Sequence, residues 1–213
     1  MVTLSVEAVL FDMDGTLVDS TAMVEHVWTE FAAANAVDAV AIIDFAHGRP
    51  SRDTIARFAA DPARIDEWLD WIHTAEGERF NEVVAVPGAV ELVSSLPRGR
   101  WAVVTSAIHA PARERLALVG IEPPQIVIGA DNVAQGKPHP EGYLAAASAL
   151  GVEPGRCVVF EDTQAGALAG LAAGCAVVLV GDLAPDVPGV VARVRDLTEV
   201  SAASDGRGIT LSL

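Results

Sequence analysis

Short runs of apolar, mostly β-branched residues recur along the chain and predict buried strands, because a strand covered on both faces shows no alternation of polar positions. These runs are residues 8–11, 101–105, 126–128, 157–160, 176–180 and, more weakly, 190–194. Between them lie stretches that favour helices, at residues 90–96, 112–119, 141–150 and 163–173. Apolar strands alternating with helices are typical of a parallel sheet with helices on both faces. The sequence therefore predicts an α/β fold.

The alternation is interrupted once, from about residue 20 to residue 84, where no strand is predicted and apolar residues fall at helical spacing. The candidate starts of three helices in this stretch are, in chain order, Asp19 or Ser20, then Ser51, then Asp61 followed by Pro62. We expect an all-helical cap domain, residues 19–84, over the carboxyl edge of the sheet. The core domain is then formed by residues 1–18 and 85–213.

The charge of the chain limits its partners. Its 213 residues carry a formal net charge of −15, and 51% of them are hydrophobic. Such a surface repels nucleic acid and anionic membranes, so neither is expected as a partner. An anionic substrate would need local positive charge to overcome this field, which makes each basic residue near a candidate site informative.

One uncharged stretch, residues 163–180, is nearly long enough to span a bilayer. Gly174 divides it into a predicted buried helix and a predicted buried strand, so we interpret it as part of the core. The first residues show no basic region and no cleavage site of a signal peptide. Cys157 and Cys175 lie in or beside apolar runs and are expected to be buried free thiols. We predict a cytoplasmic protein.

Carboxylates follow two of the predicted strands. Asp12 and Asp14 come directly after residues 8–11, and Glu161 and Asp162 come after residues 157–160. The carboxyl ends of parallel strands form the binding edge of such a sheet. Hard oxygen ligands delivered there from two strands suit Mg²⁺, which commonly shares its coordination shell with a phosphate. The sequence therefore predicts a magnesium site at this edge.

Two further segments supply groups that could bind a phosphate. Thr105 and Ser106 end another predicted strand, where a hydroxyl and backbone N–H groups could hold phosphate oxygens. Lys137 lies in a Gly-Lys-Pro loop before a helix that begins near Pro140. We interpret it as a positioned cation that neutralises a phosphate or the carboxylates.

The motifs "FDMDGT", "VVTSA", "GKPHP" and "VVFEDTQAG", in this order, resemble those of the haloacid dehalogenase superfamily of phosphohydrolases, over roughly residues 6–180. The helical insertion resembles the small cap of its phosphoglycolate phosphatase and β-phosphoglucomutase branch. Within it, "HGRPSRDTIARFA" and "ADNVAQGKPHPEGYL" are most similar to glycerol-phosphate and sugar-phosphate phosphatases. The resemblance implies a Rossmann-like core and a Mg²⁺-dependent phosphatase acting on a small phosphorylated polyol or sugar.

The resemblance also implies a role for each motif residue. Asp12 would attack phosphorus and form an aspartyl-phosphate. Asp14 would protonate the leaving alcohol and later take a proton from the attacking water. Thr105, with the backbone of Ser106, would hold the phosphoryl oxygens, and Lys137 would balance their charge.

The metal ligands implied by the resemblance come from both acidic pairs. Mg²⁺ would bind the carboxylate of Asp12, the main-chain carbonyl of Asp14 and the carboxylate of Asp162. Glu161 would contribute either directly or through a water molecule.

The cap is expected to select the substrate. His47, Arg49 and Arg52 make its "AHGRPSRD" turn basic in a strongly acidic chain, and the family places its specificity loop here. We predict that Arg52 contacts the phosphate or hydroxyls of the substrate, with His47 and Arg49 as further candidates. Cap closure would exclude bulk water.

Several alternatives remain at this point. A phosphosugar mutase would use the same residues and return the phosphoryl group to a sugar, and phosphoglycolate is an alternative phosphatase substrate. A haloacid dehalogenase does not need Asp14. A phosphonate hydrolase would need a cap lysine, and residues 20–84 contain none. A catalytically silent relative would lack a motif residue, and all are present. A monomer is expected because the cap covers the site without a second subunit.

Overall fold

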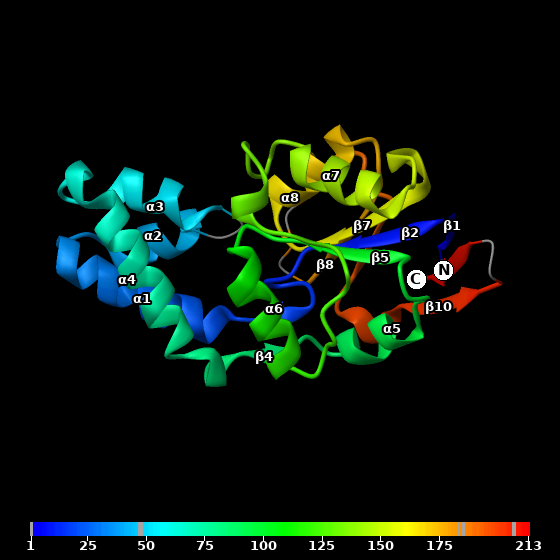
Figure 1. Cartoon of the computed structure of the whole chain (residues 1–213), viewed down its shortest axis with the longest axis horizontal. Coiled ribbons are helices and arrows are strands. Elements are labelled where there is room, and N and C mark those ends of the chain that lie inside the picture. Colours follow the sequence, from blue (N-terminus) through cyan, green and yellow to red (C-terminus); the bar gives the residue numbers. More distant parts are fainter. Residues whose placement is uncertain (1, 47–48, 183, 185, 206–207) are drawn as a thin grey trace.

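The computed structural model describes residues 2–46, 49–182, 184, 186–205 and 208–213. Within these ranges six parallel strands form the central sheet, in the order β6-β5-β2-β7-β8-β9 (Figure 1). Their bounds are β2 Ala8–Phe11, β5 Trp101–Val104, β6 Val127–Ile128, β7 Cys157–Glu161, β8 Ala176–Val180 and β9 Ala192–Val194. Each predicted strand is confirmed, with shifts at some ends. The first strand, β2, lies at the centre of the sheet.

Helices cover both faces of this sheet, which confirms the predicted α/β fold. They are α5 Ala89–Ser95, α6 His109–Leu118, α7 Glu141–Leu150 and α8 Gln164–Ala172. Alternate residues of β2 point to opposite faces. Val9 and Phe11 join one apolar cluster with α5 and α6, whereas Ala8 and Leu10 join a second cluster with α7 and α8. The sheet is therefore buried on both sides, as the unbroken apolar runs require.

The stretch between β2 and α5 is mainly helical and lies to one side of the sheet (Figure 1). It contains α1 Thr21–Asn35, α2 Ala39–Ala46, α3 Ser51–Phe58 and α4 Ile65–Gly77. Most buried apolar residues of these helices form a cluster of their own, in which Phe31 and Trp68 pack edge to face at 5.0 Å between ring centroids, while Met23 of α1 joins a cluster of the sheet. Because this cluster is distinct from those of the sheet, it supports our proposal of a separate cap.

Two details of the helical insertion differ from the sequence analysis. Helix α2 was not predicted, because its apolar residues form an almost continuous run that mixes buried and exposed positions. Ser51 was expected to cap the next helix, but it is the first residue of α3 and Pro50 occupies the N-cap position. Asp61 does cap, accepting a hydrogen bond from the backbone N–H of Ala63.

A short antiparallel ribbon joins the insertion to the sheet. Its strands are β3 Val18–Asp19 and β4 Val84–Ala85, with Val18 opposite Ala85. The ribbon lies at the two ends of the insertion, where the sequence analysis predicted no strand. We propose that residues 19–84 move as a cap on this ribbon, relative to a core formed by residues 1–18 and 85–213.

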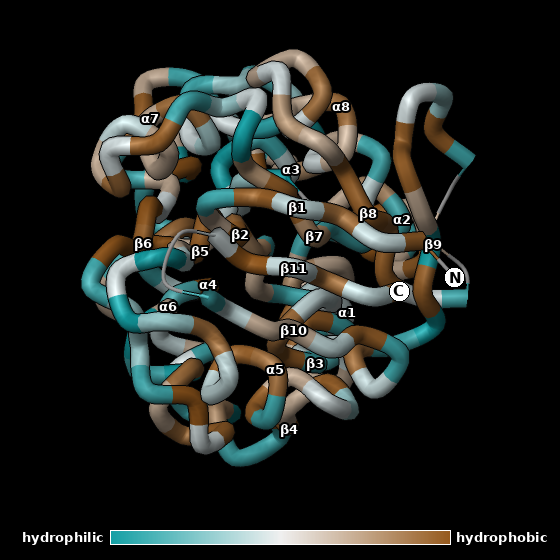
Figure 2. Tube along the Cα trace, turned by 90° about the vertical axis from the view of Figure 1, so that its right-hand side faces the viewer, coloured by the Kyte–Doolittle hydropathy of each residue, from teal (hydrophilic) through white to brown (hydrophobic). Residues whose placement is uncertain are grey.

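The chain ends meet in a second sheet (Figure 2). It contains β1 Thr3–Val6, β10 Ser201–Ser204 and β11 Ile209–Ser212, antiparallel and in the order β1-β11-β10. Strand β11 is the central strand of this sheet. Short 3₁₀ helices complete the described elements: η1 Pro62–Arg64, η2 Phe80–Glu82, η3 Ala130–Asn132, η4 Pro154–Arg156 and η5 Leu197–Glu199. Among the described residues, no helix has the length and apolar character needed to cross a membrane.

Candidate active site

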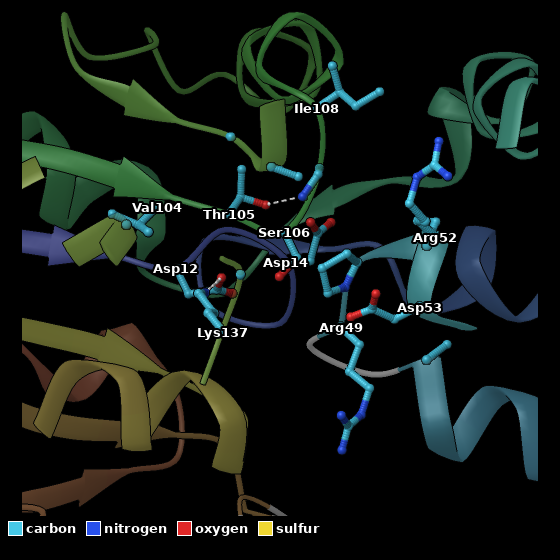
Figure 3. Close-up of a pocket in the computed structure, with 18 of the residues that line it drawn as sticks. Asp12, Asp14, Arg49, Arg52, Asp53, Val104, Thr105, Ser106, Ile108 and Lys137 are labelled. Carbon is cyan, nitrogen blue, oxygen red and sulfur yellow. Dashed lines mark hydrogen bonds and ion pairs between the residues drawn. The ribbon is translucent and has the colours of Figure 1, made fainter. Parts of the chain in front are cut away.

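A cavity of about 590 Å³ lies between the carboxyl ends of the central strands and the helical insertion (Figure 3). Residues that follow β2, β5 and β7 line it together with residues of α1, α3 and α4. The predicted site residues in its wall are Asp12, Asp14, Arg49, Arg52, Thr105, Ser106, Lys137 and Asp162. Glu161 lies behind the wall and is fully buried. His47 lies outside the described residues.

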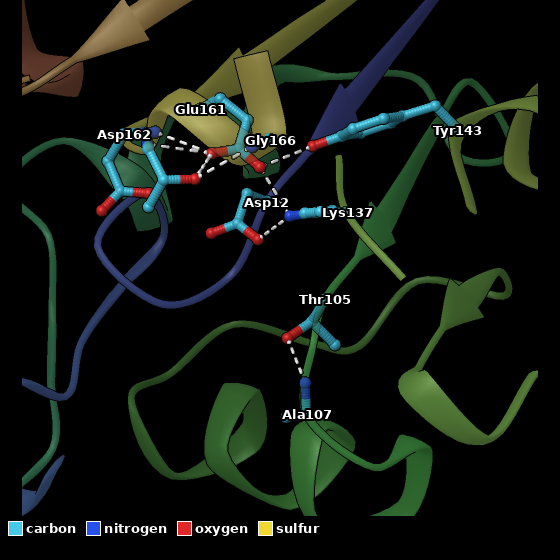
Figure 4. A network of polar contacts seen from close by, with 9 residues as sticks. Asp12, Thr105, Ala107, Lys137, Tyr143, Glu161, Asp162 and Gly166 are labelled. Atoms are coloured by element: carbon cyan, nitrogen blue, oxygen red, sulfur yellow. Dashed lines mark hydrogen bonds and ion pairs between the residues drawn. The ribbon is translucent and has the colours of Figure 1, made fainter. Parts of the chain in front are cut away.

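Asp12 directly follows the central strand β2 and is held against the neighbouring strand β7, because its backbone N–H donates to the carbonyl of Phe160. Its side chain is nearly buried, with 6% of the residue exposed. The ammonium of Lys137 donates to Asp12 Oδ1 and, at 2.5 Å, to Glu161 Oε1 (Figure 4). Burial raises the pKa of Asp12 to about 8, with a further contribution from Glu161, while Lys137 opposes the shift.

Lys137 is held as a cation between these carboxylates. Burial alone would favour the neutral amine, but the charges of Asp12 and Glu161 outweigh it and raise the pKa of Lys137. In the loop carrying Lys137, the backbone N–H groups of Ala134 and Gln135 donate hydrogen bonds to the side chain of Glu141, at the start of α7. The lysine is therefore fixed both at its tip and through its loop.

Glu161 is the most completely bonded group of the site (Figure 4). Its Oε1 accepts from Lys137 and, at 2.9 Å, from the hydroxyl of Tyr143. Its Oε2 accepts from the backbone N–H groups of Asp162 and Thr163 and from the Thr163 hydroxyl. A Cβ on Gly166 would lie 1.6 Å from Glu161 Oε1, so only glycine fits there. Glu161 thus fixes Lys137 and the loop after β7.

The carboxylates of Asp12, Glu161 and Asp162 place an oxygen each within 4.8 Å of one another. Asp162 Oδ1 is buried and has no hydrogen-bond partner among the described residues. Burial, reinforced by Asp12 and Glu161, raises the pKa of Asp162 well above its ordinary value. One lysine does not neutralise three carboxylates, and a hard divalent cation such as Mg²⁺ would complete the set. The residues present therefore fit the predicted metal.

The glycine of the first motif lets the chain turn tightly beside this cluster. Gly15 has φ +89°, and a Cβ there would lie 2.0 Å from Asp162 Oδ2. The turn that follows Asp14 consequently packs directly on the second acidic strand end, which brings the two motifs together.

Asp14 faces a different set of partners. Its Oδ1 accepts from the Ser20 hydroxyl at 2.7 Å and from Arg115 Nη1 at 2.8 Å. Asp14 thus differs in its contacts from Asp12, which is bound to Lys137, although the two residues are only two positions apart in the strand-end loop (Figure 3).

Thr105 follows β5 at the wall of the cavity. Its backbone N–H donates to the carbonyl of Ile128, and its hydroxyl accepts from the backbone N–H of Ala107 at 3.1 Å. Ser106 follows it in the same wall. The turn after β5 thus presents a hydroxyl and backbone groups to the same cavity as Asp12 and Lys137.

A family model for haloacid dehalogenase-like hydrolases matches residues 6–174. The chain belongs to this family. The hydrolase is 38% identical over 175 residues to hexitol phosphatase A of Escherichia coli, with 80% of this chain and 81% of the relative covered. It is also 38% identical over 188 residues to glycerol-1-phosphate phosphohydrolase 1 of Saccharomyces cerevisiae, covering 83% of this chain and 75% of the relative. These matches confirm the resemblance to the haloacid dehalogenase superfamily that the sequence motifs indicated.

Solved structures agree with this assignment. The hydrolase superposes on CbbY from Rhodobacter sphaeroides in complex with phosphate, with a TM-score of 0.74 and 25% identity. The similarity covers 91% of this chain and 96% of that protein. Relatives in sequence are named phosphatases, which agrees with the expected class of phosphoric monoester hydrolase.

The predicted cap residues of the hydrolase are engaged on the cap itself. Arg52 Nη2 donates to Asp66 Oδ1 at 2.6 Å, and both side chains are exposed. The Arg49 guanidinium lies 4.6 Å from the centroid of the Phe45 ring. Both arginines line the cavity, but in this cap position neither is brought against Asp12. A contact to substrate from either remains a prediction.

Several residues of the site were not singled out from the sequence. They are Gly15, Ser20, Glu76, Arg115, Tyr143, Thr163 and Gly166. Gly15, Thr163 and Gly166 lie inside the quoted motifs, so a closer consideration of those motifs could have found them. Arg115 carried a signal as well, because it falls at helical spacing with the apolar Ala112, Leu116 and Val119 in a predicted helix. Tyr143 had none, since its position in α7 is that of a core residue.

Proposed function

We propose that this hydrolase is a Mg²⁺-dependent phosphatase for a small phosphorylated polyol or sugar, acting through an aspartyl-phosphate. The observation that carries the proposal is the position of Lys137, which binds Asp12 on the cavity wall and Glu161 behind it. Beside this pair lies Asp162 Oδ1, a buried carboxylate oxygen with no hydrogen-bond partner in the part of the chain that the structure describes. A nucleophile, a fixed cation and a hard oxygen ligand thus meet at one edge of the sheet.

In this mechanism Asp12 attacks the phosphorus atom, and the bond to the leaving oxygen breaks. Asp14 gives its proton to that oxygen, and afterwards takes a proton from the water that cleaves the aspartyl-phosphate. The turn at Thr105 and Ser106 holds phosphoryl oxygens. Lys137 keeps its positive charge throughout and offsets the charge on the transferred group.

The carboxylates of Asp12 and Asp162 and the carbonyl of Asp14 would hold Mg²⁺. The ion supplies charge stabilisation for the phosphoryl oxygens when bound. Glu161 was predicted as a further ligand, directly or through water. Its oxygens already accept from five donors, which favours a role in fixing Lys137.

The substrate class rests on the relatives and on the cavity. Hexitol phosphatase A and glycerol-1-phosphate phosphohydrolase 1 are named for polyol phosphates. The cap side of this cavity is lined by mixed apolar and polar residues, including Trp28, Leu69, His73 and Glu76. Such a wall suits a hydroxyl-bearing carbon chain. That the enzyme works as a cytoplasmic monomer remains part of this proposal.

Phosphate release from a panel of phosphorylated polyols, hexoses, pentoses and phosphoglycolate tests the proposal, with Mg²⁺ and with EDTA. We expect metal-dependent release from polyol or sugar phosphates by the wild type and none by Asp12→Asn. Asp44→Asn, which alters an exposed carboxylate of α2, is the matched control. Absence of release, together with isomerisation of a hexose 1-phosphate when a bisphosphate is added, would assign a mutase instead.

A further inference from the structure

Arg115 is a buried arginine that faces the cavity from the core. It belongs to α6 and is 3% exposed, between Ala112 and Leu116, which are fully buried in the core of the sheet. Its Nη1 donates to Asp14, and its Nε is buried without a hydrogen-bond partner among the described residues. Burying a guanidinium is costly unless its charge is paired. Among the described residues its ion pair is with the carboxylate of Asp14, at 2.8 Å, and the charge of Arg115 also acts on the Glu76 carboxyl.

The two groups that hold Asp14 come from different parts of the chain, the ribbon and helix α6. Ser20 directly follows β3 of the ribbon that joins the insertion to the sheet, so its contact depends on the position of that ribbon. Arg115 is fixed by the packing of α6 on the sheet and does not depend on the ribbon. Its contact with Asp14 can therefore persist when the insertion moves.

The geometry at Asp14 leaves part of the carboxylate for chemistry. Ser20 and Arg115 both donate to Oδ1, so neither contact requires Oδ2. The guanidinium is permanently charged and planar, so a carboxylate that it holds at one oxygen has a restricted orientation. Orientation of an acid–base group to within hydrogen-bond reach is what proton transfer requires.

We propose that Arg115 is a positioning residue that holds Asp14 for proton transfer to the leaving group, an inference that rests on the proposed phosphatase function. Arg115 acts through Asp14 and does not itself take part in bond making. Its loss should affect the departure of poor leaving groups far more than that of good ones, because only poor leaving groups need the proton.

A series of aryl phosphates tests this role, from 4-nitrophenyl phosphate to 4-methoxyphenyl phosphate, whose phenol has a pKa near that of tyrosine. The quantity compared is kcat/KM, which reports the steps up to formation of the aspartyl-phosphate. For Arg115→Met we expect a small loss with the nitrophenyl ester. With the methoxyphenyl ester we expect a loss at least about tenfold larger, within the range of general acid catalysis. Asp14→Asn should show the same pattern more strongly.

Two further variants separate positioning from folding. Arg115→Lys keeps the charge and should restore part of kcat/KM for the poor leaving groups. Arg113→Met removes an arginine of the same helix, whose Nη1 donates to the carbonyl of Pro124 outside the cavity. This variant should leave the slope of kcat/KM against leaving-group pKa unchanged. If Arg115→Met does not fold, the slope measured with Arg115→Lys decides.

The proposal is overturned if the dependence of kcat/KM on leaving-group pKa is the same in the wild type and the Arg115 variants, or if all esters lose activity equally. Wild-type protein that releases phosphate from none of these esters or from the polyol panel would instead contradict the proposed function. The two failures are therefore distinguishable.

Discussion

The ammonium of Lys137 lies 2.5 Å from Glu161 Oε1, at the end of a strand that neighbours the one carrying Asp12. This contact joins a loop after β6 to the end of β7, and the loop thereby reaches across β5 and β2. The same ammonium binds Asp12, so the nucleophile and the buried carboxylate are tied through one side chain. Disturbing Glu161 should consequently be felt at Asp12.

Gly166→Ala should disturb this arrangement without removing any polar group. The added methyl would lie 1.6 Å from Glu161 Oε1, and either the carboxylate or helix α8 must shift. We expect a loss of stability of about 1–3 kcal/mol, as for an overpacked core, together with at least about a tenfold fall in kcat, because Lys137 loses its anchor. Denaturant unfolding and phosphate release measure both effects.

Gly77→Ala is the control for this substitution. Gly77 ends helix α4, and a Cβ there would meet no atom within 4 Å. Alanine should leave activity unchanged and stability equal or slightly higher, because glycine is the weaker helix former. A Gly166→Ala protein with normal kcat would show that Glu161 is not needed to hold Lys137 against Asp12.

The sequence predicted the strand ends well because an unbroken apolar run marks where a buried strand begins and ends. Asp12, Thr105, Lys137 and Asp162 all line the predicted edge. Asp12, Thr105 and Asp162 each directly follow a strand whose burial leaves little freedom in where the chain emerges. The haloacid dehalogenase resemblance then assigned roles that spacing alone would have left open.

Contacts between distant segments were not predictable in the same way. Strand β1 pairs with β11, about the whole chain length away, and neither segment has an apolar run long enough to stand out. Arg115 meets Asp14 across 101 positions. Such pairs depend on the assembled fold, and a local pattern carries no information about which partner a side chain will meet.

Magnesium should stabilise the folded protein before any substrate is present. A ligand that binds only the folded state at about 100 times its Kd adds about 2.7 kcal/mol. We expect an increase in the melting temperature with Mg²⁺, reversed by EDTA. In Asp162→Asn this increase should largely disappear, because the variant loses a proposed ligand whose Oδ1 has no hydrogen-bond partner among the residues described. Asp44→Asn should respond like the wild type. An equal increase in Asp162→Asn would place the ion elsewhere.

Glu76 should make stability depend on pH. It lines the cavity from α4, near Arg115 and Asp14. Burial raises its pKa from 4.5 to about 7, with Arg115 opposing the shift and Asp14 adding to it. Between these values the unfolded chain releases a proton that the folded protein keeps, so the free energy of unfolding falls as pH rises from about 4.5 to about 7. The cost above pH 7 is at most about 3 kcal/mol.

Glu76→Gln removes this cost. Relative to the wild type, the variant should gain stability at pH 8 and little at pH 4.5, in denaturant unfolding at both values. Glu78→Gln, at an exposed position just beyond the same helix, controls for the change in net charge and should show no such difference. A stability difference between Glu76→Gln and the wild type that is the same at both pH values would contradict the buried environment of Glu76.

Lys137 is the sole lysine of the chain, which allows its protonation to be probed chemically. Only neutral amines are acylated, and Asp12 and Glu161 raise the pKa of Lys137 while 7% of its side chain is exposed. Native protein treated with an amine-reactive ester at pH 8 should therefore acquire label at the α-amino group alone. Denatured protein should also be labelled at Lys137, at a rate at least about tenfold higher. Intact-mass spectrometry distinguishes the two products.

Asp12→Asn removes one of the two anions and should accelerate labelling of the folded protein, whereas Asp44→Asn should not. Rapid labelling of native wild type at Lys137 would mean that the lysine is neither buried nor paired, and the charge arrangement proposed for catalysis would fail with it.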